Sequence, residues 1–153
     1  MKQKLKCVLL IDDDEPTNFI STMLLNEAAC TEHIQVAESG AMALNYLTSS
    51  ECFSCETNSF PCPDIIFLDI NMPAMNGWEF LEKYKLLDQK HHGKLIIIML
   101  TTSLNPEDKI RAEAMPEISG FENKPISVEM IDRVVKAYFE KEVEHTVSIP
   151  VYS

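Results

Sequence analysis

The chain has 153 residues, of which 46% are hydrophobic, and this is enough for one hydrophobic core in a single domain. Its 24 acidic and 13 basic residues give a formal net charge of -11, which disfavours direct binding to nucleic acid and adsorption to a membrane surface. No stretch approaches the roughly 20 apolar residues of a membrane span and the N-terminus does not resemble a signal peptide, so we expect a cytoplasmic protein.

Strand-like apolar runs recur five times along the chain. They lie at Leu5–Ile11, His33–Ala37, Asp64–Leu68, Leu95–Leu100 and, more weakly, Ile118–Glu122. The clearest of these runs are rich in leucine and isoleucine, which is typical of strands that are buried on both faces of a sheet.

Helical patterns fill the intervals between these runs. The first helix follows Asp14, which we interpret as a helix cap, and Pro16 suits the first helical position. Its expected buried stripe consists of Phe19, Ile20, Met23 and Leu24. Later helices are expected to begin at Ser39, Gly77, Asn105 and Ser127. Pro116 should end the fourth helix.

Strands that alternate with helices predict right-handed crossovers and a parallel sheet. The fold class is therefore α/β: a five-stranded parallel sheet with helices on both faces, in a three-layer, doubly wound arrangement. We expect one domain over residues 1–142 and a C-terminal tail over residues 143–153, with no output domain.

The stretch from Ser49 to Pro63 has no periodicity, and we expect it to be a surface loop. It contains Cys52, Cys55 and Cys62, which could be read as part of a zinc or redox site. Because no histidine lies in the stretch and four ligands at suitable spacing are lacking, a polar loop with incidental, reduced cysteines is the favoured interpretation.

Aspartates follow two of the predicted strands. Asp12 and Asp13 come directly after the first strand, and Asp69 comes directly after the third. These carboxylates should meet at the carboxyl edge of the sheet, where open parallel sheets bind ligands. Clustered carboxylates repel one another unless a cation compensates, so the pattern predicts a site for Mg2+, with Mn2+ as an alternative.

Two further strand ends carry groups that suit phosphoryl chemistry. The hydroxyl of Thr101 can donate to a phosphoryl oxygen, and the ammonium of Lys124 can pair with one. A carboxylate surrounded by a metal, a hydroxyl and a lysine is equipped for phosphoryl transfer, with Asp69 as the nucleophile.

Four blocks in this order resemble the receiver domain of two-component response regulators, the CheY-like family. The blocks are LLIDD at 9–13, FLDINMPAMNG at 67–77, MLTTS at 99–103 and GFENKP at 120–125. The resemblance extends from about Leu5 to Tyr138, and its specificity comes from the four blocks occurring together. It implies a flavodoxin-like sheet with strand order 2-1-3-4-5.

The resemblance implies that Asp69 accepts a phosphoryl group from a histidine of a sensor kinase or phosphotransfer protein. It also implies that Asp13, Asp69 and the backbone carbonyl of Asn71 coordinate Mg2+, while Asp12 acts through bound water. Thr101 and Lys124 would contact the phosphoryl group. A cis peptide is implied before Pro125, a geometry that is inexpensive only at an X-Pro bond.

In the family, output depends on coupling between the switch hydroxyl, here Thr101, and an aromatic residue that corresponds to Phe121. Phenylalanine has no hydroxyl, so switching would rely on packing of its ring. The implied partner surface is the face of the fourth helix, fifth strand and fifth helix, where an unknown downstream protein would bind.

The leading hypothesis is a single-domain, phosphorylation-controlled binding module that is not a turnover enzyme, apart from self-dephosphorylation. One alternative is a phosphatase of the haloacid-dehalogenase type, whose Asp-x-Asp pattern would require a second acid where this chain has Asn71. The other alternative is an interaction scaffold that works independently of phosphorylation.

Overall fold

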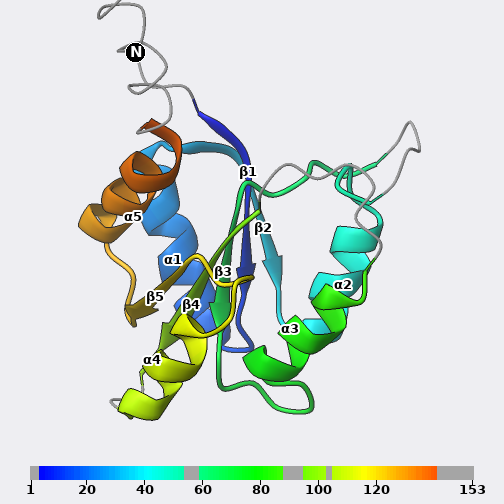
Figure 1. Ribbon diagram of the computed structural model, residues 1–153. Coiled ribbons are helices and arrows are strands. Elements are labelled where there is room, and N and C mark those ends of the chain that lie inside the picture. The colour runs from blue at the N-terminus through cyan, green and yellow to red at the C-terminus, as the bar shows by residue number, and fades with distance from the viewer. Residues whose placement is uncertain (1–3, 54–58, 88–94, 103–104, 141–153) are drawn as a thin grey trace, which may run out of the picture.

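The computed structural model describes residues 4–53, 59–87, 95–102 and 105–140. These residues build one parallel sheet in the order β2-β1-β3-β4-β5, as predicted (Figure 1). The strands are β1 (Leu5–Ile11), β2 (Thr31–Ala37), β3 (Ile65–Asp69), β4 (Ile96–Thr101) and β5 (Gly120–Asn123). Every residue of β3 and β4 is buried, because helices cover both faces of these central strands.

The helices divide between the two faces of the sheet (Figure 1). They are α1 (Glu15–Ala28), α2 (Gly40–Thr48), α3 (Gly77–Lys85), α4 (Pro106–Glu113) and α5 (Val128–Val135), and α5 continues into a π-helix at Lys136–Glu140. One core lies between the sheet and α1 with α5, around Leu25 and Ile131. The other lies between the sheet and α2, α3 and α4, around Leu47, Phe80 and Ala112. The three-layer α/β class is therefore confirmed.

Helix starts follow the capping rules. The side chains of Ser39, Asn76, Asn105 and Ser127 each accept a hydrogen bond from a backbone N–H in the first turn of the helix that follows. Helix α4 ends at Glu113, before Pro116, as expected. The bounds of β1 match the predicted ones, and those of the other four strands differ by one or two residues, as is usual at element ends.

The predicted buried stripe of α1 is wrong for three of its four members, whereas Leu24 packs against the core. Phe19, Ile20 and Met23 are 67%, 53% and 56% exposed, whereas Asn18, Ser21 and Leu25 face inward. Both sets fit helical spacing, so periodicity alone favoured the more apolar one. The inward orientation is tolerated because the buried Asn18 amide has a hydrogen-bond partner, the carbonyl of Asp12.

The expectation of reduced, incidental cysteines is wrong for two of them. Cys52 and Cys62 form a disulfide. The segment that they close is also packed: the ring of Tyr46 stacks on Phe60 with centroids 5.3 Å apart, and the Tyr46 hydroxyl donates to the carbonyl of Pro61 at 2.8 Å. Cysteine spacing alone does not reveal which residues pair, so the sequence could not have given this link.

Two of the other three cysteines lie in the part of the chain that the structure describes. Cys7 and Cys30 have free thiols, and burial raises the pKa of Cys7 to about 11, which makes that thiol a poor nucleophile at neutral pH. Cys55 and the predicted tail at 143–153 lie outside the described residues.

Within the described part of the chain, none of the helices combines the length and the apolar character needed to cross a membrane.

The disulfide should contribute measurably to stability. It closes a loop between positions ten residues apart, and such a constraint on the unfolded chain is worth about 2 to 3 kcal/mol. We expect a reducing agent to lower the free energy of unfolding of the oxidised protein by this amount in urea titrations, and to leave a Cys52→Ala variant unaffected. Equal urea midpoints for the oxidised and reduced wild-type protein would contradict the expectation, and Cys30→Ala serves as a control that keeps the disulfide.

Candidate functional site

The ends of four strands meet at one edge of the sheet. Asp12 directly follows β1, Asp69 and Thr101 are the last residues of β3 and β4, and Lys124 directly follows β5. The strands are parallel and in register, with Ile11 opposite Leu68, so their carboxyl ends lie side by side. Asp12, Asp69 and Thr101 are buried, which makes this edge a polar pocket with little solvent contact.

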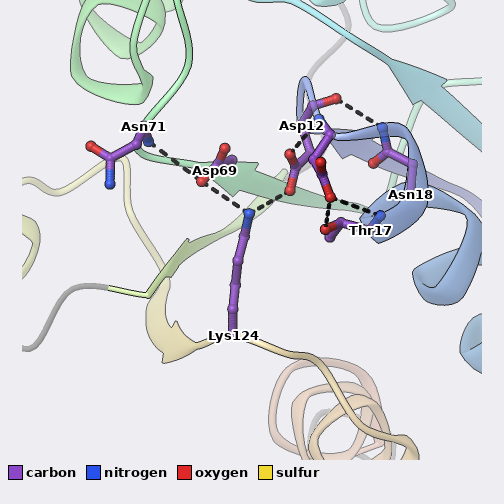
Figure 2. A network of polar contacts seen from close by, with 7 residues as sticks. Asp12, Thr17, Asn18, Asp69, Asn71 and Lys124 are labelled. Carbon is purple, nitrogen blue, oxygen red and sulfur yellow. Dashed lines mark hydrogen bonds and ion pairs between the residues drawn. The ribbon is translucent and has the colours of Figure 1, made fainter.

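Lys124 joins the two buried carboxylates. Its Nζ lies 2.5 Å from Asp12 Oδ2 and 3.1 Å from Asp69 Oδ1, and its side chain is 13% exposed (Figure 2). The backbone N–H of Lys124 donates to the carbonyl of Thr101 at 2.8 Å, which ties the start of this loop to β4. The peptide bond between Lys124 and Pro125 is cis, as predicted.

The charges in this pocket do not balance. Burial, together with the negative charge of Asp12, raises the pKa of Asp69 above its ordinary value, although Lys124 partly opposes the shift. Burial alone would lower the pKa of Lys124, but the hydrogen bond and charge of Asp12 and the nearby Asp69 raise it overall. One ammonium ion therefore faces two buried carboxylates and remains protonated between them.

A divalent cation suits the remaining negative charge. Oxygen atoms of Asp12, Asp13 and Asp69 all lie within 4.8 Å of one another, and Asp13 is the exposed member of this group. Carboxylate oxygens are the ligands that Mg2+ prefers in proteins. Both oxygens of Asp12 already accept hydrogen bonds, from the Asp14 backbone N–H and from Lys124, so Asp13 and Asp69 have more freedom to bind a metal directly.

The segment after β3 brings α3 close to Asp69. The backbone N–H of Gly77 donates to the carbonyl of Ile70 at 2.8 Å. A Cβ atom on Gly77 would lie 2.8 Å from the backbone oxygen of Asp69 and 3.0 Å from Ile70 Cα, so a side chain here would force the helix away from the strand. Asn71 lies in this segment, and its N–H points to Asp69 Oδ1 at 3.4 Å.

The predicted switch residues share one face of the sheet. In the register of β4 and β5, Phe121 lies opposite Met99, and Thr101 lies two residues beyond Met99 on the same face. Phe121 is partly buried and packs against the core cluster that also contains Met99 and Ala112 of α4. The aromatic ring and the hydroxyl therefore border the same layer of the molecule.

Sequence reasoning found Asp12, Asp13, Asp69 and Lys124, which the structure brings together, but it missed Asn18. The side chain of Asn18 donates from Nδ2 to the backbone oxygen of Asp12 at 2.8 Å (Figure 2). Asn18 lies three and seven residues before the other inward-facing positions, Ser21 and Leu25, but the more apolar stripe of α1 has the same periodicity, so spacing alone did not reveal it. Asp14 caps α1 as predicted, accepting hydrogen bonds from the N–H and hydroxyl of Thr17.

Comparison with known proteins identifies a single family. A family model described as the response regulator receiver domain matches residues 8–136. The crystal structure of a two-component response regulator from Cytophaga hutchinsonii is 34% identical with a TM-score of 0.76, and the match covers 88% of this chain and 97% of that one. Sporulation initiation phosphotransferase F from Bacillus subtilis is 27% identical over 86% of this chain and 91% of its own length.

Longer proteins contain a similar region. A protein-glutamate methylesterase/protein-glutamine glutaminase from Desulfotalea psychrophila is 29% identical over 86% of this chain, which spans only 35% of that protein. The chain spans 28% and 54% of two other curated relatives. The similarity to these proteins therefore concerns one part of their length.

The unfavourable charge on Asp69 gives a pH-dependent prediction. In the absence of divalent metal, Asp69→Asn should raise the free energy of unfolding at pH 7, because it removes a buried negative charge next to Asp12. In the folded protein, the pKa of Asp69 lies above its ordinary value of 3.8. At low pH the Asp69 carboxyl is protonated and carries no charge that would destabilise the fold. It loses this proton, and the fold loses stability, as the pH rises through the pKa of the folded state. The gain from Asp69→Asn should therefore shrink as the pH falls toward 3.8.

Urea titrations between pH 4 and pH 8 in a metal chelator would measure this gain, with Asp64→Asn at the other end of β3 as the control. Mg2+ at ten times its dissociation constant should then stabilise the wild-type protein by about 1.4 kcal/mol and the Asp69→Asn variant by less. A loss of stability in Asp69→Asn at pH 7, or a gain that does not vary with pH, would contradict the electrostatic account.

Proposed function

The chain belongs to the response regulator receiver domain family, and on that premise we propose that it is a phosphorylation-controlled binding module with Asp69 as its phosphoacceptor. The observation that carries this proposal is the position of Lys124, whose ammonium contacts both Asp12 and Asp69 where adjacent strands end. A receiver domain is a signalling phosphoacceptor domain and in general not a turnover enzyme.

The proposed reaction transfers a phosphoryl group from a phosphohistidine. A carboxylate oxygen of Asp69 attacks phosphorus, a new O–P bond forms, the N–P bond breaks, and the imidazole leaves and takes up a proton. Lys124 stays protonated and pairs with a phosphoryl oxygen, and the hydroxyl of Thr101 donates to another. Receiver domains interact with histidine kinases or phosphotransfer proteins, and we propose a protein of this kind as the phosphodonor.

A divalent metal fits the proposed site. Asp13, Asp69 and the backbone carbonyl of Asn71 would hold Mg2+, or Mn2+ in its place, and Asp12 would act through bound water. This arrangement is supported by the cluster of Asp12, Asp13 and Asp69 oxygens and by the hydrogen bonds that already occupy Asp12. When bound, the metal supplies positive charge that neutralises the phosphoryl oxygens.

The proposed output surface is the face formed by α4, β5 and α5, where a downstream protein would bind. Thr101 and Phe121 border the layer that contains α4, so a movement of the hydroxyl toward a phosphoryl group would change the packing of the ring. Among the elements that form this face, α4 carries the exposed side chain of Ile110, and an ion pair joins Glu122 on β5 to Arg133 on α5. Exposed apolar and charged groups of this kind suit a protein partner.

The alternatives have less support. A phosphatase of the haloacid-dehalogenase type needs a general acid two residues after its nucleophile, and the amide of Asn71 cannot donate a proton in that role. Sustained turnover of phosphate esters would revive this alternative. A scaffold that works independently of phosphorylation would bind its partner equally well before and after modification of Asp69. The formal net charge of -11 supports a protein that does not bind nucleic acid directly.

Phosphorylation by a small molecule tests the assignment of Asp69. With Mg2+ and acetyl phosphate, the wild-type protein should gain one phosphoryl group, detected by intact-protein mass spectrometry, because the pocket can neutralise the incoming charge. Asp69→Asn should gain none, whereas Asp64→Asn at the opposite end of β3 should be modified like the wild type. Equal labelling of the wild-type protein and Asp69→Asn would defeat the proposal.

Nuclear magnetic resonance tests the coupling to the output surface. Beryllofluoride, a phosphoryl analogue, should change the amide chemical shifts of β4, α4 and β5 in the wild-type protein with Mg2+. Thr101→Ala should lose most of the changes in α4 and β5, because the hydroxyl can no longer move to the analogue. Thr102→Ala is the matched control, since Thr102 is exposed. Undiminished changes in α4 and β5 of Thr101→Ala would rule out coupling through this hydroxyl.

A further inference from the structure

Asn18 is a buried polar side chain on the inward face of α1, and the proposed phosphoryl transfer gives it no role. Its side chain lies among the first turns of the helix with only 5% of its surface exposed. The amide nitrogen Nδ2 donates to the backbone oxygen of Asp12 at 2.8 Å, and this hydrogen bond is itself buried. Figure 2 shows the side chain pointing from α1 toward the loop that carries Asp12.

Together with three other hydrogen bonds, this one holds Asp12 in place. Its backbone N–H donates to the carbonyl of Ala37 at 3.1 Å. Its two carboxylate oxygens accept from the N–H of Asp14 at 2.9 Å and from Nζ of Lys124 at 2.5 Å. With Asn18 on the backbone carbonyl, the backbone N–H, the backbone oxygen and both carboxylate oxygens of Asp12 each have a hydrogen-bond partner.

The fixed carbonyl also determines the position of the next residue. The peptide unit between Asp12 and Asp13 is planar, so the direction of the Asp12 carbonyl sets the direction of the Asp13 N–H and the place of its Cα. Asp13 is the exposed member of the three-carboxylate cluster, whereas Asp12 and Asp69 are held by burial and by Lys124. The orientation of Asp13 therefore depends mainly on its backbone.

We propose that Asn18 is a positioning residue for the divalent-metal site, which acts by holding the Asp12 carbonyl so that the Asp13 carboxylate lies beside Asp69. The inference rests on the proposed function, in that it takes the carboxylate cluster as the metal site. Asn18 does not contact the metal. An apolar side chain at this position would leave a buried carbonyl without a donor, and the peptide would rotate toward water and carry Asp13 away.

The test measures metal affinity directly, without phosphorylation. Mn2+ is titrated into the full chain and its free concentration is followed by electron paramagnetic resonance, and Mg2+ is then used to displace it. Asn18→Leu should weaken the affinity for both ions by about tenfold, the lower end of the effect seen when groups that orient metal ligands are removed. Asn26→Leu, at an exposed position on the same helix, should bind like the wild-type protein.

Two further variants separate positioning from a general loss of structure. Asn18→Met removes the donor without adding charge and is less branched than leucine, so it should also weaken binding even where Asn18→Leu folds poorly. In an Asp13→Asn background, Asn18→Leu should have little additional effect on metal affinity, because Asn18 acts through Asp13. Thermal melting without metal establishes that each variant is folded.

The outcomes distinguish the inference from the proposed function. A wild-type protein that binds neither Mn2+ nor Mg2+ would overturn the proposed metal site, and the role of Asn18 with it. A wild-type protein that binds the metals, with folded Asn18→Leu and Asn18→Met variants of unchanged affinity, would overturn the role of Asn18 alone. An equal loss of affinity in the presence and absence of Asp13 would also overturn it.

Discussion

The site depends on the salt bridges that Lys124 forms with Asp12 and Asp69. Two buried carboxylates next to each other are unfavourable, and the ammonium at 2.5 Å and 3.1 Å compensates only part of their charge. The ammonium of Lys124 therefore holds the two carboxylates together, but the three groups retain a net negative charge. In the proposed function, this remaining charge attracts a cation, and the bound cation then allows an anionic phosphoryl group to approach.

The parallel sheet converts distant positions in the sequence into neighbours. Lys124 follows Asp12 by 112 residues, yet the two meet because β1, β3, β4 and β5 run in the same direction and end at one edge. Gly77 allows α3 to begin against the end of β3, and Asn18 anchors the loop after β1 from within α1. The groups proposed for chemistry thus come from strand ends, while the helices that pack on the sheet fix the loops that carry them.

The strand-end residues could be predicted because a buried parallel strand is a clear pattern and its last position is easily located. Asp12, Asp69, Thr101 and Lys124 were found in this way. The parallel sheet followed from the alternation of strands and helices, and the strand order followed from the family resemblance. The orientation of α1 could not be predicted, because two stripes satisfy the same periodicity and only tertiary contacts decide between them. The disulfide depends on how a loop without periodicity folds, which neither spacing nor composition determines.

The central claim is that Asp69 is the phosphoacceptor in a pocket shared with Lys124, Thr101 and a metal held by Asp13. A crystal structure of the protein with Mg2+ and beryllofluoride tests it most directly. The account predicts beryllium bonded to a carboxylate oxygen of Asp69, fluorine atoms in contact with Lys124 and Thr101, and Mg2+ bound by Asp13. An adduct on Asp12 or Asp13, or Mg2+ bound away from this edge of the sheet, would contradict it.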